Sequence, residues 1–260
     1  MRKKTVGWLI FATVLILIGC LLFAGVMTAL HWDFAKLSTV TYETTTYDIT
    51  DAYRNVTIVT DTADIVFVAS ESDKTSIVCY EQTDNKHAVA VNEDTLVIEL
   101  MDTTEWQDYI GVNFDSPTIT VSVPQGDYGS LSIKTSTGDI DLENVSADTL
   151  DLSVTTGDVT VTAVQCRQFQ SSGNTGEVSL KNVIAEQNFT IKRSTGDVTL
   201  DGCDAADMDI TTDTGDVDGR LLSDKVFFVQ TSTGDIDVPE TTTGGRCAIT
   251  TSTGDITIVL

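Results

Sequence analysis

The sequence contains few of the side chains on which enzyme catalysis usually depends. Only two histidines occur in 260 residues, His31 and His87, and His31 stands at the edge of a long apolar run. No Ser/His/Asp set can be assembled around His87, and no glycine-rich nucleotide loop is present. Carboxylates are abundant, but they recur too evenly to mark out the two residues of a glycosidase. We therefore predict that the protein is not an enzyme and has no catalytic residues.

Basic residues are also scarce. The chain has 15 Lys and Arg against 39 Asp and Glu, a formal net charge of -24. Three of the basic residues, Arg2, Lys3 and Lys4, precede the first apolar run, so the remainder is still more acidic. Such a surface repels phosphate backbones. This charge excludes nucleic acid as a partner and favours cations or cationic surfaces.

Cysteine motifs are absent, although five cysteines occur. No CxxC pair or Cys/His cluster indicates zinc. Two of the five fall at apolar positions of the repeat described below, where they are predicted to be small core residues. A disulfide or a reactive thiol is the alternative interpretation. The five are Cys20, Cys79, Cys166, Cys203 and Cys247.

Aromatic residues make up only 7% of the chain, whereas hydrophobic residues reach 41%. The core must therefore be built mainly from Val, Ile and Leu. Because β-branched side chains pack well on a pleated surface, this composition is typical of repetitive β-structure.

One long uncharged run lies near the N-terminus. Residues 5–32 contain no Asp, Glu, Lys or Arg, and a transmembrane helix needs roughly 20 apolar residues. Trp8 and Trp32 stand near its ends, where indole rings favour the headgroup layer. Basic residues precede the run, so the positive-inside rule predicts a cytoplasmic segment 1–4, a single-pass anchor 5–32 in the cell membrane and an extracellular C-terminal domain. A cleaved signal peptide, or lipidation at Cys20, is the alternative.

A Thr-Gly-Asp motif recurs seven times, once with Glu in place of Asp. The glycines are spaced by 19 or 20 residues throughout. We interpret them as structural turns. They are Gly138, Gly157, Gly176, Gly196, Gly215, Gly234 and Gly254.

Apolar residues flank each turn at fixed distances, at seven and five residues before the glycine and at two and four after it. Alternation on both sides indicates two short strands, each with one buried face. The parity shifts at the glycine, so the chain must bend there through backbone angles that glycine permits. A third apolar position follows seven residues after the glycine, at Val145, Val164, Val183, Cys203 and Leu222.

These features predict an all-β fold, a β-solenoid (β-helix-like) of 19–20-residue coils that stack in sequence order. A sandwich of hairpins is the alternative. A weaker eighth copy lies around Ala63. We predict a juxtamembrane stalk or capping strand at 33–50, irregular N-terminal β coils at 51–125 and the regular repeats at 126–260. The aromatic-rich stretch 102–114, with Trp106, Tyr109 and Phe114, is interpreted as a cap of the open core or as a binding loop.

The acidic residue after each glycine would form a column in a stacked solenoid. Carboxylates ~5 Å apart repel by about 0.8 kcal/mol per pair in water, and a bound cation such as calcium would remove that cost. The alternative is ordinary turn chemistry, in which the acid accepts backbone amides. On the second interpretation the protein needs no cofactor. The column consists of Asp139, Asp158, Glu177, Asp197, Asp216, Asp235 and Asp255.

The repeated S-T-G-D-[IV] segments at 136–140, 194–198, 232–236 and 252–256, after one helix and a short basic start, resemble a bacterial family. That family comprises membrane-anchored "putative adhesin" proteins of unknown function with β-strand repeats, including the LiaG-like type. The resemblance covers most of residues 50–260. It implies a membrane-tethered outer domain with a solenoid-like fold and brings no catalytic residues.

The function that these features favour is a non-enzymatic cell-envelope protein, which presents its solenoid as an adhesion, binding or scaffolding surface. An accessory regulator of an envelope-stress sensing system and a carbohydrate-active β-helix enzyme are the alternatives. The expected partners are the membrane, through the N-terminal helix, and an envelope protein or glycan. The chain ends inside its last coil, so we also expect an end-to-end homodimer through the C-terminal coil.

Overall fold

The computed structural model describes residues 2–33, 40–101 and 115–260. Helix α1 (Arg2–Ala29) and the β-structure form two separate units. Within α1, the stretch Val6–Ala29 is long and apolar enough to cross a membrane, which suits either an anchor or a signal sequence. Its two threonine hydroxyls donate to carbonyls one turn earlier, Thr13 to Leu9 at 2.9 Å and Thr28 to Ala24 at 2.7 Å, so they need no outside partner.

The second unit consists of strands joined mostly in parallel. The alternating burial predicted from the sequence is present in nearly all of them. The strands are β1 (Tyr42–Ile49), β2 (Asn55–Val59), β3 (Asp64–Ser70), β4 (Thr75–Gln82), β5 (His87–Asn92), β6 (Thr95–Leu100), β7 (Thr118–Pro124), β8 (Asp127–Thr137), β9 (Ile140–Glu143), β10 (Ser146–Thr156), β11 (Val159–Thr175), β12 (Val178–Thr195), β13 (Val198–Thr214), β14 (Val217–Leu221), β15 (Lys225–Gln230), β16 (Ile236–Asp237), β17 (Gly245–Thr253) and β18 (Ile256–Val259).

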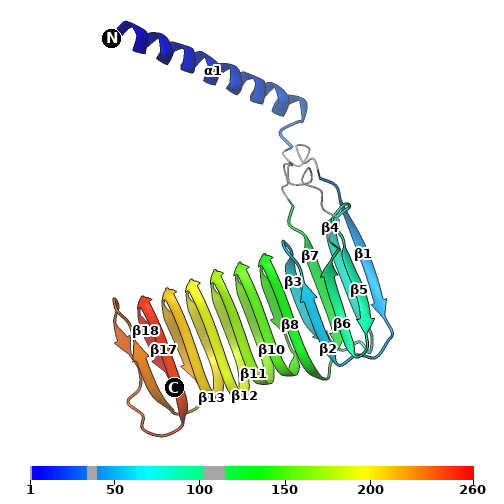
Figure 1. The fold of residues 1–260 in the computed structure, drawn as a ribbon, viewed down its shortest axis with the longest axis vertical. Helices are drawn as coiled ribbons and strands as arrows, with labels where there is room; N and C mark the ends of the chain where they lie inside the picture. The colour runs from blue at the N-terminus through cyan, green and yellow to red at the C-terminus, as the bar shows by residue number, and fades with distance from the viewer. Residues whose placement is uncertain (1, 34–39, 102–114) are drawn as a thin grey trace. The chain divides into compact units, whose positions relative to one another are not determined.

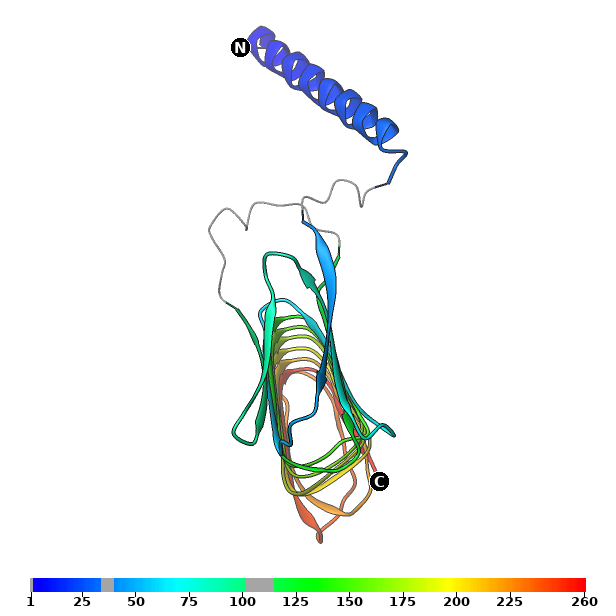
Figure 2. The same ribbon diagram turned by 90° about the vertical axis from the view of Figure 1, so that its right-hand side faces the viewer.

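From β8 to β13, successive coils lie on one another (Figures 1 and 2), and like residues are in register between them. Leu131 pairs with Leu150, and Leu150 pairs with Phe169. The rings of Phe169 and Phe189 continue this ladder, stacked with centroids 4.8 Å apart. Each fully buried side chain of this size contributes about 1.5–3 kcal/mol through the hydrophobic effect. The predicted β-solenoid-like fold is confirmed.

The weak repeat around Ala63 lies directly against the first regular coil, although 75 residues separate Ala63 from Gly138. Val56 pairs with Leu131, and Ile65 pairs with Ile140. The described strands between the two coils are placed outside this contact. β6 and β7 stack in parallel on β2 and β3, and the antiparallel strands β1, β4 and β5 cover that end. The aromatic stretch 102–114 falls outside the described residues.

The order of the last two coils differs from the order expected. β17 lies between β13 and β15, and β18 lies between β14 and β16. The prediction that all coils stack in sequence order is therefore wrong at this end. The premise that the C-terminal coil is the open end is also wrong, because the coil formed by β15 and β16 lies outside it.

One apolar position was also assigned to the wrong residue. Leu222 is 62% exposed, whereas Leu221 is 1% exposed and pairs with Cys203. The pairing of β13 with β14 shifts by one residue after Asp201. This shift moves Leu221 to the inner face, which a fixed spacing from the glycine cannot anticipate.

The cysteines are free thiols, and all except Cys20 are buried, as predicted for Cys203 and Cys247. Burial raises the pKa to about 12 for Cys79, Cys166 and Cys247, and to about 11 for Cys203.

We expect a maleimide at pH 8 to label none of the four buried thiols of the native β-structure, Cys79, Cys166, Cys203 and Cys247, and all four after unfolding in urea. At pH 8 only about one in a thousand or fewer of the buried thiols is ionised, and none of them is accessible to the reagent. Stability should fall as the pH rises through about 9 to 12, because the unfolded thiols ionise first. Mass spectrometry of labelled chains is the measurement, and rapid labelling of four or five native thiols would contradict this packing.

Candidate functional site

The seven turn glycines stack into a column, and their backbone geometry shows why each turn requires glycine. Their φ angles lie between +130° and +150°, a region that L residues rarely adopt. Neighbouring turns also touch backbone to backbone. The Gly157 amide donates to the Thr175 carbonyl at 2.9 Å, and a Cβ built on Gly157 would overlap the carbonyl oxygen of Gly138. The sequence indicated the bend, whereas the close approach between coils emerges only from the structure.

The acidic residues of the motif form the expected column on the exposed side of the turns. One carboxylate oxygen of each aspartate accepts the amide of the acidic residue in the next coil. Oδ1 of Asp139 accepts from Asp158 at 2.8 Å, and Oδ1 of Asp158 accepts from Glu177 at 2.7 Å. In the described part of the chain, no three His, Cys, Asp or Glu residues are grouped so that they could hold a metal ion. The contacts therefore favour turn chemistry, and a calcium ladder stays a prediction.

Glu177 allows the contribution of this carboxylate–amide hydrogen bond to stability to be measured. Among the described residues of the column, Glu177 and Asp197 are the one adjacent pair without such a bond. Glu177→Asp should restore it and raise the free energy of unfolding by about 1 kcal/mol. The same change at exposed Glu186 serves as the control in urea unfolding monitored by circular dichroism. Equal effects at the two positions would show that the column contributes nothing.

The inner side of the turns carries a second column, three residues before each glycine. Buried threonines dominate it, and their hydroxyls donate to glycine carbonyls, Thr212 to Gly196 and Thr251 to Gly215, both at 3.2 Å. These bonds satisfy carbonyls that would otherwise be buried without a donor.

Val154, Gly173 and Arg193 interrupt the threonines of this column, and the side chain of Arg193 is 3% exposed. Its Nη2 donates to the Ser171 hydroxyl at 3.3 Å, and its Nη1 lies 3.5 Å from the Val154 carbonyl oxygen. Nε is buried without a partner. Gly173 leaves the space that the guanidinium fills. Burial lowers the pKa of Arg193, against the effect of Asp158. The sequence signal was the small pair at 171 and 173, which replaces the usual larger residues.

His87, the one histidine beyond the edge of the N-terminal apolar run, is 2% exposed. Its Nδ1 lies 2.8 Å from Glu81 Oε2, and its Nε2 lies 2.8 Å from the Thr60 hydroxyl. The hydroxyl–imidazole–carboxylate order is that of a hydrolase relay. Yet Thr60 is 7% and Glu81 1% exposed, and the adjoining cavity of about 10 Å³ is the size of a single water. No substrate can reach this network, which links β4 and β5 to the neighbouring coil.

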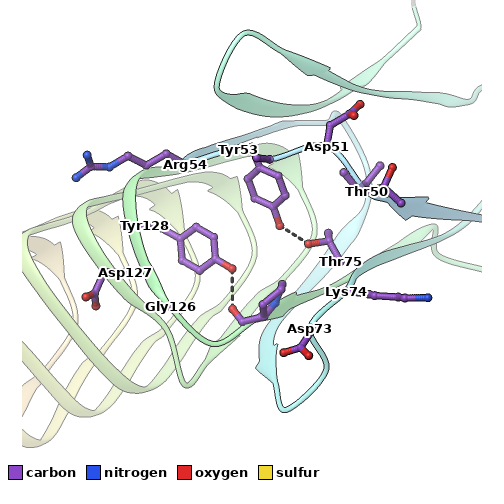
Figure 3. A pocket seen from close by; sticks show the side chains of 13 residues that line it. Thr50, Asp51, Tyr53, Arg54, Asp73, Lys74, Thr75, Gly126, Asp127 and Tyr128 are labelled. Atoms are coloured by element: carbon purple, nitrogen blue, oxygen red, sulfur yellow. Dashed lines mark hydrogen bonds between the residues drawn. The ribbon is translucent and has the colours of Figure 1, made fainter.

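An open cleft lies where the β1–β2, β3–β4 and β7–β8 connections meet (Figure 3). Its volume is about 510 Å³. The rings of Tyr53 and Tyr128 line it, 6.2 Å apart and 21° from parallel, with Tyr53 half-buried and Tyr128 only 8% exposed. The Tyr128 hydroxyl donates to the Pro124 carbonyl at 2.7 Å, and the Tyr53 hydroxyl bonds to that of Thr75. We call this site the tyrosine cleft.

The tyrosine cleft has a polar rim of both signs. Five exposed charged residues surround the rings, namely Asp51, Arg54, Asp73, Lys74 and Asp127. Burial is the main cause that raises the pKa of Tyr53 and of Tyr128, so both phenols stay protonated at neutral pH. The cleft therefore offers an aromatic wall, carboxylate acceptors and cationic donors. Sequence reasoning missed it because its residues come from three distant loops with no shared motif.

A second hollow of about 540 Å³ continues from the tyrosine cleft and shares Arg54, Asp127 and Tyr128 with it. Asp148 bridges two arginines there, Arg54 at 3.1 Å and Arg167 at 2.8 Å. These groups are 41–65% exposed, and such pairs contribute about 0–1 kcal/mol each. Their main effect is to hold the rim in place along the direction in which the coils stack.

Solved structures and a family model place the fold among known proteins. No curated protein matches the chain. A solved structure from Bacteroides fragilis, described as a putative adhesin, is 16% identical with a TM-score of 0.55, over 84% of this chain and 97% of that one. A putative adhesin from Parabacteroides distasonis is 14% identical with a TM-score of 0.48, over 84% and 97%. A putative cell adhesion protein from Clostridium sporogenes is 11% identical with a TM-score of 0.39, over 85% and 99%.

At these identities the Bacteroides fragilis structure shows the fold alone. The family model is the stronger finding, because it spans all the coils and the tyrosine cleft apart from its first residues. It matches residues 53–260, most of the chain. The protein therefore belongs to the Toastrack DUF4097 family.

Proposed function

We propose that this protein is a non-enzymatic, membrane-anchored envelope protein that binds a carbohydrate chain outside the cell through its tyrosine cleft. The observation that carries the proposal is the half-buried ring of Tyr53, backed by the buried ring of Tyr128, within a rim of carboxylates and cations. A sugar presents flat C–H surfaces and many hydroxyls. Aromatic rings suit the first, and groups that accept or donate hydrogen bonds suit the second.

The rest of the molecule supports a binding role. The polar network around His87 is closed to substrates, and the turn carboxylates already accept amides. The cleft is open, and its continuation past Asp148 provides room for several units of a polymer. The apolar length of α1 suits a membrane anchor that would hold this domain at the cell surface. The adhesin descriptions of the structural neighbours agree with such a role.

The test is a glycan array probed with the full chain in detergent. Tyr53→Ala and Arg54→Ala should each weaken binding about tenfold, which equals about 1.4 kcal/mol. Tyr53→Phe should bind nearly as well as the native protein, because the ring and not its hydroxyl faces the sugar. Lys192→Ala, an exposed residue on β12 with the same charge change as Arg54→Ala, is the control.

Two outcomes would reject the proposal. One is that no glycan binds at all while a partner protein is captured from the native envelope by crosslinking. The other is binding that Tyr53→Ala and Arg54→Ala leave unchanged while their melting temperatures equal that of the native chain.

A further inference from the structure

The C-terminal coil is inserted between two coils that precede it in the sequence. Cys247 pairs with Met208 on one side and with Phe227 on the other. In the same way, Ile256 pairs with Val217 and with Ile236. The turn glycines repeat this order, because Gly254 lies against Gly215, and Gly234 lies against Gly254.

The chain path therefore leaves a slot that residues 245–260 fill. After β14 the chain passes to the outermost position, forms β15 and β16, and returns to the inner position as β17 and β18. Within the described residues, β15 and β16 pair with no strands other than β17 and β18. Lys225 at the start of β15 bonds Asp204 and Ala205 of β13 directly, but the strands of the outer coil can pair only after residues 245–260 have entered the slot.

The slot is built for a repeat segment and not for a unique sequence. Residues 231–236 and 251–256 both read Thr-Ser-Thr-Gly-Asp-Ile. The inserted segment continues the same ladders as every other coil, with Cys247, Ile249 and Ile256 fully buried. The identical segment of a second copy would make the same contacts in the same register.

The connector to the slot is suited to crossing between copies. Residues 238–244 join the outer coil to β17 and contain Pro239 and Gly244. Gly244 has a φ of +104° and lies against the Asp224 carbonyl, so the closed connector is constrained. A short, constrained hinge before a terminal element favours exchange of that element between identical chains, because every other contact is preserved.

We propose that the slot between β13–β14 and β15–β16 takes the C-terminal coil of a second copy, so that the protein forms a strand-exchanged dimer. The occupant is residues 245–260 of the other chain. The deep burial of this coil makes exchange slow once a chain has closed on itself. The choice between closed and exchanged forms is therefore made during folding, and it depends on the chain concentration.

The test uses two full-length chains, each with Cys20→Ser to remove the exposed thiol. One carries Asp209→Cys and the other Ala248→Cys, since residues 209 and 248 are partners across β13 and β17. The chains are mixed unfolded, refolded in detergent at two concentrations tenfold apart, and oxidised. The control pair is Asp209→Cys with Thr190→Cys, which are partners across β12 and β13 and are not exchanged.

Exchange predicts covalent dimers for the 209/248 pair, at a dimer-to-monomer ratio roughly tenfold higher at the higher concentration. The control pair should yield at least fivefold less. Dimer formation by the 209/248 pair at or below the level of the control, at both concentrations, would overturn the proposal. A single chain with both cysteines gives an internal crosslink whenever the slot forms, so misfolding is distinguished from absence of exchange.

Discussion

Replacement of Gly157 by alanine is expected to lower the free energy of unfolding by about 3–5 kcal/mol. A left-handed backbone conformation costs an L-residue about 1–2 kcal/mol, and φ at this position is +148°. The added methyl also overlaps the carbonyl oxygen of Gly138, and relief of such overlap costs about 1–3 kcal/mol. Because the two nearest atoms, O and C of Gly138, belong to the backbone, no side-chain movement can relieve the overlap. Urea unfolding followed by circular dichroism measures the loss.

Gly126→Ala is the matched control for this change. A Cβ at Gly126 meets no atom within 4 Å, so the substitution should change stability by less than about 0.5 kcal/mol. Equal losses for Gly126→Ala and Gly157→Ala would show that the turns are not stacked as described.

A double substitution at the buried arginine should stabilise the protein by about 1–4 kcal/mol. The variant is Ser171→Ile with Arg193→Thr, which gives both positions the residue found at the same place in an adjacent coil, Ile191 and Thr212. Gly173 is kept, the described hydrogen bonds of the buried guanidinium run to Ser171 and Val154 and not to a carboxylate, and Nε has no acceptor in the described residues. Replacing buried charge with well-packed residues of the surrounding type often gains free energy of this size.

The single change Gly173→Ala serves as the opposing control, because a Cβ there would overlap both the guanidinium and the Val154 carbonyl. It should destabilise the protein, whereas the double variant raises the melting temperature. A double variant less stable than the native chain would mean that Arg193 contributes a favourable contact that outweighs its desolvation.

The repetitive part of the fold could be predicted because one signal recurs at fixed spacing. The alternation of apolar and polar residues on both sides of Gly157 determines which side chains lie inside. Parallel stacking then follows, because every repeat has the same pattern. Because the repeats are so alike, the sequence does not reveal the order in which the last coils stack. The segments around Gly234 and Gly254 fit one another's positions, so the sequence holds no local feature that says which of them lies next to Gly215.

The candidate site escaped prediction for a related reason. Tyr53 lies on the β1–β2 connection, Thr75 and Tyr128 lie at the starts of β4 and β8, and the three meet only because the Ala63 coil stacks on the Gly138 coil across 75 residues. Periodicity reports the faces of strands, not the loops between them. The one-residue shift that buries Leu221 in place of Leu222 has the same character, because it depends on how β14 meets β13.

The most direct test of this account separates scaffold from binding site in one experiment. Glycan binding and unfolding free energy are measured together for Tyr53→Ala, in the cleft, and for Asp158→Ala, in the turn column. The account predicts that Tyr53→Ala loses about tenfold in affinity, whereas Asp158→Ala binds as the native chain does and loses about 1–2 kcal/mol of stability. Loss of glycan binding in Asp158→Ala with full binding by Tyr53→Ala would place recognition on the Thr-Gly-Asp turns and contradict it.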